Sequence, residues 1–329
     1  MIICFPHPPG SGGPGSFQKR FERELQALGW KVIYKGAFEM PELIFVVGGT
    51  RRLLWLLLMK LKGVPIVYRL DGIGWLHRKK KVGLKKFLLS ESQNWGSKFI
   101  HAFLADKIVY QSRFVEYWWN RKGWRKRKNI SVIYNGIQMP KDENQKIVSG
   151  ISARLVVMEG TIDYSPYAVR LLNDLAARLP AEISMELYGK FEFSNNLQQL
   201  DKRINYKGFL PPDQVTGVLT GSVYLSLDIN PACPNTVIEA MSCGAPVVAF
   251  DTGSLKELVS ENCGNIVPYG SDPWKLAYPE TNSLIISIAK VMRNYAFYSV
   301  NARNLAKEKF SIEDMTSNYI EVINSLLKK

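Results

Sequence analysis

The chain has few of the features that mark secreted, metal-binding or membrane-spanning proteins. Only four of its 329 residues are cysteines, and their spacing fits neither a disulfide framework nor a metal site, so we expect reduced, mostly buried thiols. No secretory signal pattern follows Met1. The longest apolar run, residues 53–61, contains Lys60 and is too short for a spanning helix, which needs about 20 residues. We therefore expect a cytoplasmic chain that does not cross a bilayer.

Low-complexity tracts and internal repeats are also missing, and 46% of the residues are apolar, so the composition is that of a folded protein. A chain of this length exceeds what one core usually supports, and two domains are expected. The net charge of +14 is one-sided: residues 1–150 hold 27 Lys and Arg against 10 Asp and Glu, whereas residues 151–329 hold 16 against 19. This excess predicts an anionic partner for the first half.

Short β-branched or apolar runs alternate with longer helical patterns, which predicts an α/β fold with parallel sheets. The strands expected in the first half are 2–5, 31–34, 43–47, 66–68, 107–110 and 131–134. Those expected in the second half are 154–158, 184–188, 204–206, 223–227 and 246–250. The clearest helical patterns are 17–28, 84–104 and most of 283–327, and the polar, Pro-containing segment 137–150 predicts a linker between two doubly wound domains.

The segment NPACPNTVIEAMSCGAPVVAFDTGS, residues 230–254, places one carboxylate in an otherwise apolar helix. Gly244 and Pro246 predict the end of that helix. The backbone N–H groups at its start form a natural anion site. Glu239 can accept hydrogen bonds from the two hydroxyls of a ribose, and the alternative is a solvent-facing or salt-bridged glutamate.

Several segments, in order along the chain, resemble the retaining GT-B glycosyltransferases of family 4. The strongest are PNTVIEAMSCGAPVVAFDTGSLKELV and NCGNIVP, which resemble the donor-nucleotide signature. Weaker resemblances are GSGGPGSFQKRFERELQALGWKV, ADKIVYQSRFVEYW, VIYNGI and YKGFLPPDQVTGVL. The distributed match is more specific than any single motif.

The resemblance implies two Rossmann-like domains facing a cleft: an acceptor-binding domain at 1–138, a nucleotide-sugar-binding domain at 139–310, and a C-terminal helix at 311–329 that crosses back to the first domain. It implies transfer of a hexosyl group from a nucleoside-diphosphate sugar to a saccharide or lipid-linked acceptor, with retention of configuration. No DxD-like acidic cluster is present, so no metal or other cofactor is expected. Cell-surface polysaccharide or glycolipid assembly is the expected setting.

The donor-binding residues implied by the resemblance come from a Gly-rich loop and from the signature helix. They are Gly13, Gly15, Ser16, Lys190, Pro234, Asn235, Thr236, Val237 and Glu239. The chain departs from the family at two points. Pro231 stands where a first glutamate is common, and the segment VVMEGTIDYSP lacks the usual diphosphate-binding Arg and Lys. Lys190 and Arg154 are the candidate replacements, and a catalytically silent GT-B protein that docks a membrane-associated complex is the alternative function.

Asp71, in VYRLDGIGW, follows an expected strand and therefore lies where the carboxyl end of the sheet opens. We expect it to orient the acceptor hydroxyl and take its proton. The alternative is an aspartate that satisfies loop amides. Arg69 either orients Asp71 or binds an acceptor phosphate.

Two stretches, 75–87 and 117–128, combine aromatic residues with dense Lys and Arg. This composition is typical of peripheral attachment to anionic lipid headgroups, here at the inner face of the membrane. The candidate contacts are Arg78, Lys79, Lys80, Trp118, Trp119 and Trp124. A solvated face is one alternative. Nucleic-acid binding is the other, but no nucleic-acid-binding motif accompanies the stretches.

Overall fold

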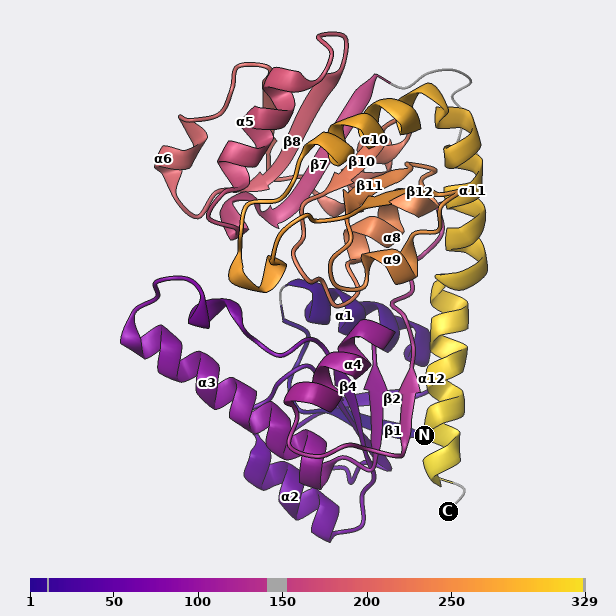
Figure 1. The fold of residues 1–329 in the computed structure, drawn as a ribbon. Coiled ribbons are helices and arrows are strands. Elements are labelled where there is room, and N and C mark those ends of the chain that lie inside the picture. The colour runs from indigo at the N-terminus through magenta and orange to yellow at the C-terminus, as the bar shows by residue number, and fades with distance from the viewer. Residues whose placement is uncertain (11, 141–152, 328–329) are drawn as a thin grey trace. The chain divides into compact units, whose positions relative to one another are not determined.

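The computed structural model describes residues 1–10, 12–140 and 153–327 (Figure 1). The chain divides into two compact units: unit 1 comprises Met1–Gly136 with Ile312–Lys329, and unit 2 comprises Ile137–Ser311. The predicted linker lies, from residue 141 onward, outside the described residues. All four cysteines are free and buried.

Unit 1 contains a six-stranded sheet in the order β2-β1-β3-β4-β5-β6, with parallel pairing throughout. Its strands are β1 Ile2–Phe5, β2 Lys31–Tyr34, β3 Leu43–Val47, β4 Ile66–Leu70, β5 Lys107–Tyr110 and β6 Ile130–Val132. The predicted strands are confirmed, with end shifts of one or two residues. Because β3 is buried along its whole length, its sequence is a continuous apolar run without alternation. β4 is equally buried but contains Arg69.

The helices of unit 1 cover this sheet. They are α1 Gly12–Ala27, α2 Leu53–Leu61, α3 Leu84–Phe99, α4 Arg113–Lys122 and α12 Ile312–Leu327. A short 3₁₀ turn, Leu76–Arg78, precedes α3, and a π-helical turn, Ile100–Leu104, continues it. The first helix begins earlier than the predicted residue 17, because the Gly-rich segment is itself helical from Gly12.

One aromatic cluster joins the last helix to the start of unit 1. The Tyr319 ring of α12 lies 5.4 Å from Phe17 and 5.0 Å from Phe21 on α1, and 5.5 Å from Phe45 on β3, between ring centroids. All four rings are buried. Residues at opposite ends of the sequence therefore share one core.

Replacing Tyr319 with Ala should remove the central ring of this cluster. We expect the free energy of unfolding to fall by about 3–5 kcal/mol, the usual cost of emptying a large aromatic site in a core, as measured by chemical denaturation. Tyr117→Ala is the control, because Tyr117 is 58% exposed and its loss should change stability little. A similar loss for both variants would contradict the packing described here.

Unit 2 contains a second six-stranded parallel sheet, in the order β12-β11-β10-β7-β8-β9. Its strands are β7 Arg154–Thr161, β8 Ser184–Lys190, β9 Ile204–Gly208, β10 Val223–Ser226, β11 Val247–Phe250 and β12 Gly264–Val267. The first five match the predicted strands. The last strand was not predicted, because it is short and begins with a glycine, which is unusual in strands. Packing requires this glycine, since an added Cβ would lie 1.9 Å from the Val247 carbonyl oxygen.

The helices of unit 2 are α5 Ala168–Arg178, α6 Ser194–Leu197, α7 Val215–Leu219, α8 Asn235–Ser242, α9 Leu255–Leu258, α10 Asn282–Arg293 and α11 Tyr295–Lys309. Short 3₁₀ turns lie at Ile162–Tyr164, Pro212–Gln214 and Pro273–Lys275. The strand order reverses between β7 and β10. In doubly wound sheets, ligands bind beside the carboxyl ends of the strands at such a reversal.

Candidate functional site

The helix α8 starts at the strand reversal of unit 2, in the loop that follows β10. Pro234 precedes it with extended backbone and no side-chain cap. The first backbone N–H groups of an α-helix have no partner within the helix, and a helix start is a natural anion site. Gly244, with φ 70°, follows the helix. Glu239 is half-buried on this helix, while Val237 and Ile238 are buried against the core.

The loop before α8 is fixed to the loop that follows β11. The Asn230 N–H donates to Thr252 Oγ1 (3.3 Å), which itself donates to the Asp228 carbonyl (3.2 Å), and the Ser254 N–H donates to the Pro231 carbonyl (3.0 Å). An added Cβ at Gly253 would lie 2.4 Å from the Pro231 nitrogen. Pro231 is therefore part of a closely packed turn.

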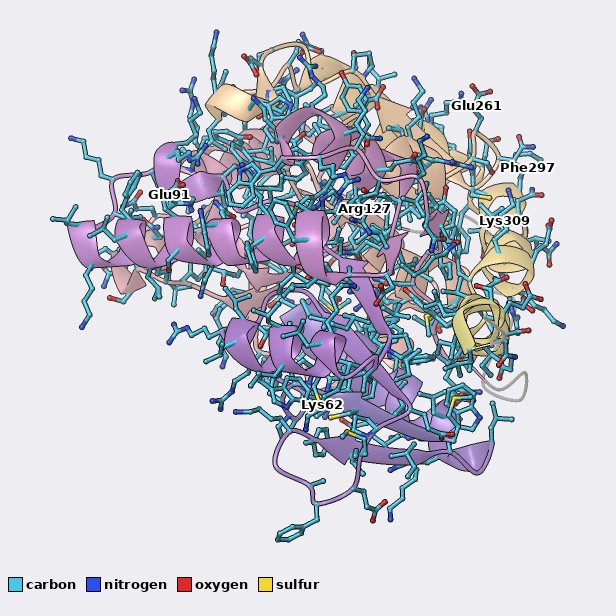
Figure 2. All side chains as sticks on the ribbon, turned by 90° about the horizontal axis from the view of Figure 1, so that it is seen from below. Lys62, Glu91, Arg127, Glu261, Phe297 and Lys309 are labelled. Carbon is cyan, nitrogen blue, oxygen red and sulfur yellow. The ribbon has the colours of Figure 1, made fainter. Side chains whose placement is uncertain are left out.

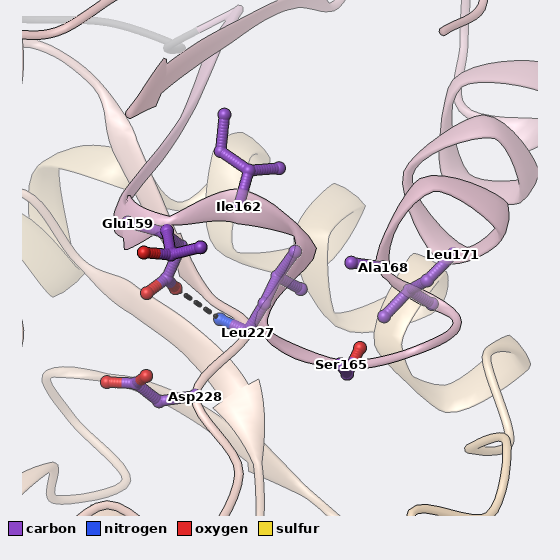
Figure 3. A pocket seen from close by; sticks show the side chains of 8 residues that line it. Glu159, Ile162, Ser165, Ala168, Leu171, Leu227 and Asp228 are labelled. Carbon is purple, nitrogen blue, oxygen red and sulfur yellow. Dashed lines mark hydrogen bonds between the residues drawn. The ribbon is translucent and has the colours of Figure 1, made fainter. Parts of the chain in front are cut away.

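Two carboxyl groups that the sequence did not reveal as a pair lie at the same reversal. Glu159 is near the end of β7, Asp228 follows β10, and both line a small cavity of about 10 Å³ (Figure 3). Glu159 Oε1 accepts a hydrogen bond from the Leu227 N–H at 3.1 Å. Burial, then the charge of Asp228, raises the pKa of Glu159 well above its usual value. Burial also raises the pKa of Asp228 to about 6, although its hydrogen bond with Glu159 opposes the shift.

The carboxyl pair is electrostatically linked to α8 through Tyr224. Its hydroxyl donates to the Met158 carbonyl at 3.1 Å and is also hydrogen-bonded to the Thr236 side chain at the start of α8. Burial, followed by the charge of Glu159 and smaller contributions from Asp228 and Glu239, raises the pKa of Tyr224 well above its usual value. Three carboxyl groups thus act on one buried phenol.

The two candidate replacements for the missing cations lie at opposite ends of the sheet. Lys190 is the last residue of β8, where it pairs with Thr161 of β7 and lies 5.0 Å from the Phe209 ring centroid. Arg154 is the first residue of β7, donates to the Val218 carbonyl and pairs with Glu186 at 3.7 Å. Because ligands bind at the carboxyl ends, the hypothesis for Arg154 is wrong. Lys190 stands at the edge that the hypothesis requires.

The carboxyl pair predicts how stability varies with pH. Raised pKa values mean that these two carboxyl groups hold more protons in the folded state than in the unfolded chain between about pH 4 and pH 6, so their contribution to stability falls as pH rises through this window. The lowered pKa of buried His101 acts in the opposite direction over this range, so the contribution of the pair is measured as a difference between variant and wild type. Asp228→Asn should abolish much of that fall and stabilise the protein at pH 8 by about 1–3 kcal/mol. Thermal unfolding at pH 5 and pH 8 measures it, with the exposed Asp213→Asn as control. If Asp228→Asn raises the Tm no more at pH 8 than at pH 5, the sign is refuted.

In unit 1, Asp71 lies at the carboxyl end of β4 and is held by buried partners. Its Oδ1 accepts hydrogen bonds from Arg69 Nη1 (2.9 Å) and Gln111 Nε2 (2.5 Å), and its carbonyl accepts one from Trp119 Nε1 (2.8 Å). The Asp71 side chain is 27% exposed. An added Cβ at Gly48 would lie 2.9 Å from its Oδ2, so that glycine leaves space for the second carboxylate oxygen.

Arg69 is 1% exposed, and both of its terminal nitrogens donate within this network. Its Nη2 donates to Gln111 Oε1 (3.0 Å) and Asn135 Oδ1 (2.7 Å), and its guanidinium carbon lies 3.9 Å from the Phe17 ring centroid. Such burial leaves no room for an acceptor phosphate. Of the two roles considered for Arg69, the structure supports orientation of Asp71 and contradicts phosphate binding.

Arg69→Met should leave Asp71, Gln111 and Asn135 without their shared donor. We expect the free energy of unfolding to fall by about 3–5 kcal/mol, as when one partner of a buried ion pair is removed, measured by urea denaturation. Arg51→Met, at an exposed position, should change it by no more than about 0.5 kcal/mol. An Arg69 variant as stable as the wild type would show that the network is dispensable.

The predicted Gly-rich loop is the first turn of α1. Gly13 is exposed, Ser16 is half-buried and Gly15 is buried. An added Cβ at Gly15 would lie 1.9 Å from the Gly10 carbonyl oxygen, so close packing of the backbone requires this glycine. The expectation of a loop is wrong from Gly13 onward, because these residues lie within α1, whereas Gly12 at its start has φ 79°.

The basic and aromatic candidates separate into exposed and buried groups. Lys79 is exposed and Lys80 is half-buried, whereas Arg78 is exposed and pairs with Glu91. Trp124 is 45% exposed, but Trp118 and Trp119 are only 7% and 2% exposed. The prediction that Trp118 and Trp119 touch a membrane is therefore wrong, because that face of α4 packs into the core.

Within residues 1–10, 12–140 and 153–327, no three potential metal ligands are grouped together. That no metal takes part in the reaction stays a prediction. In the same part of the chain, every helix is too short or too polar to span a membrane.

Comparison with known proteins identifies relatives of this chain. Residues 153–278 match the family model described as "Glycosyl transferases group 1". Among solved structures, HepE (Alr3699) of Anabaena, in complex with UDP, is 16% identical, with a TM-score of 0.70 over 98% of this chain and 99% of that chain. Sucrose-phosphate synthase from Thermosynechococcus elongatus is also 16% identical, with a TM-score of 0.65 over 99% of both chains.

The pneumococcal O-GlcNAc transferase GtfA, in complex with UDP and GlcNAc, is 12% identical, with a TM-score of 0.62 over 87% of this chain and 57% of that chain. No curated protein sequence gives a significant match. At these identities the structural likeness establishes the fold. The predicted α/β class with two Rossmann-like domains is confirmed.

Proposed function

Because residues 153–278 form a group 1 glycosyltransferase domain within a GT-B fold, we propose that this protein transfers a hexosyl group from a nucleoside-diphosphate sugar to a saccharide or lipid-linked acceptor. The observation that carries the proposal is the strand reversal of unit 2, where α8 begins and Glu239 lies on the same short helix. UDP is the first nucleotide to test, because HepE and GtfA were each crystallised with it.

In this proposal the diphosphate lies at the start of α8. Backbone N–H groups at a helix start stabilise the charge that develops on a departing diphosphate, and Asn235 and Thr236 supply the first of them. Glu239 accepts hydrogen bonds from the ribose hydroxyls. Lys190, at the carboxyl end of β8, is the candidate cation.

Unit 1 is proposed to bind the acceptor. The Asp71 carboxylate, with Oδ1 held by Arg69 and Gln111, would use its second oxygen to accept a hydrogen bond from the acceptor hydroxyl and take its proton. Retention of configuration and a role in polysaccharide or glycolipid assembly complete the proposal. The basic first half is proposed to attach the enzyme to an anionic membrane surface.

Calorimetric titration with UDP, GDP, ADP and CMP tests the donor site. We expect one nucleotide to bind, and Glu239→Gln to weaken it by about 1.5–3 kcal/mol, the scale for losing a hydrogen bond to a charged group. Glu261→Gln is the matched control, because Glu261 is exposed in the same unit. If no nucleotide binds at millimolar concentration, the donor assignment fails.

A second function, nucleotide or saccharide binding without turnover, is favoured by Pro231 and by the carboxyl pair at the strand reversal, where the family commonly has cations. Hydrolysis or transfer assays distinguish the enzyme from the docking protein. They use a nucleotide sugar with the same base as the nucleotide that binds in the titration. Turnover that Asp71→Asn abolishes supports the enzyme. Tight binding without turnover supports the docking protein.

A further inference from the structure

The solvent side of α2 and α3 is unusually apolar. The two helices lie side by side (Figures 1 and 2), and an added Cβ at Gly96 of α3 would lie 3.8 Å from the Leu53 side chain of α2. Only Leu56 of α2 is buried. The name α2–α3 face is used here for six exposed side chains of this region. Three are leucines at helical spacing on α2, and three are aromatic residues of α3 and of the segments that follow α3 and α4: Leu54, Leu58, Leu61, Trp95, Phe103 and Trp124.

The aromatic members of this face form a connected surface cluster. The Trp95 ring stacks on Phe99 at 5.4 Å and meets Trp124 edge-on at 5.6 Å, while Phe99 lies 5.4 Å from Phe103. Trp95 is 53% exposed and Phe103 is 55% exposed. A contiguous exposed patch of this kind marks an interaction surface, and tryptophan is enriched where membrane meets water.

The charge around the face has one sign. Residues 51–128 hold 20 Lys and Arg against four Asp and Glu. Each of these four carboxylates, Asp71, Glu91, Asp106 and Glu116, is ion-paired with a basic side chain. The remaining positive charge includes exposed Lys62 at the end of α2 and exposed Lys85 on α3, so basic and apolar side chains are exposed on the same two helices, which favours an anionic partner.

We propose that the α2–α3 face docks on an anionic lipid bilayer, with its leucine and aromatic side chains at the boundary between headgroups and acyl chains. Leucine side chains would not be buried against the phosphates and base edges of a nucleic acid, which argues against that partner. A second copy of the chain would carry the same positive charge and would be repelled. The lipid surface satisfies both features. The inference specifies the membrane attachment in the proposed function and is independent of the donor site.

Vesicle co-sedimentation of the full chain tests the inference. We expect binding to phosphatidylcholine vesicles that contain phosphatidylglycerol, little binding to phosphatidylcholine alone, and release at high salt. Trp95→Ser with Trp124→Ser should lower the partition coefficient at least about tenfold. Phe297→Ser is the matched control, because Phe297 of α11 is 54% exposed (Figure 2) and lies in unit 2.

A second variant tests the charge separately. Lys85→Glu with Lys86→Glu should lower partition about tenfold or more, since each basic residue near an anionic surface contributes to attachment. Lys307→Glu with Lys309→Glu, on the exposed part of α11, should have little effect. The proposal would be overturned if the partition coefficient were unchanged in both the double tryptophan variant and the Lys85 and Lys86 variant. So would a wild-type dimer that the tryptophan variant dissociates, or tighter binding to oligonucleotides than to vesicles.

Nucleotide titration of the same samples separates this inference from the function. Variants that bind UDP like the wild type while losing vesicle binding support a distinct membrane surface. A wild type that binds vesicles but no nucleotide overturns the donor assignment and leaves the docking surface standing.

Discussion

The parallel pairing of β7 with β10 is the contact on which the chemistry of unit 2 depends. Tyr224 pairs with Val156 in the middle of the two strands, so their carboxyl ends come together. The chain leaves β7 toward β8 on one side and leaves β10 toward β11 on the other. The loops that follow β7 and β10 consequently diverge. Glu159, Asp228 and the start of α8 lie together where they separate.

The two units stabilise carboxylates at their strand ends by different means. In unit 1 a buried guanidinium compensates the charge of Asp71. In unit 2 the described groups that act on Glu159 and Asp228 are each other and the backbone: the two carboxyl groups share a hydrogen bond, and the Leu227 N–H donates to Glu159. The Arg69 guanidinium fixes the position of Asp71 Oδ1. The proton shared by Glu159 and Asp228 can instead be lost or gained, so the charge of that pair can change.

Much of the architecture was predictable from the sequence, because each strand is a local apolar run. The end of the helix around Glu239 was likewise predictable from Gly244 and Pro246. The carboxyl pair was not predictable, since Leu227 and its acceptor Glu159 are 68 positions apart and only the strand order brings them together. The segment VVMEGTIDYSP shows by itself that the basic residues are missing. It does not show which residues from elsewhere in the chain contact Glu159.

The errors in unit 1 have a different physical origin. Aromatic and basic residues alternate in YWWNRKGWRKRK, and composition does not say which of them face inward. The α4 helix turns Trp118 and Trp119 into the core, where Trp119 donates to the Asp71 carbonyl. The apolar run of α2 is too short to span a bilayer, but a helix lying on a membrane surface needs only one apolar side.

The position of α12 in the core of unit 1 also has a consequence for synthesis. A ribosome releases the six strands of unit 1 long before residues 312–327, and until then Phe17, Phe21 and Phe45 lack the Tyr319 ring that completes their cluster. Domains usually fold in the order in which they emerge. Here unit 2 can complete its core first. Until the last helix emerges, the phenylalanine rings of unit 1 lack their Tyr319 partner and are accessible to chaperones.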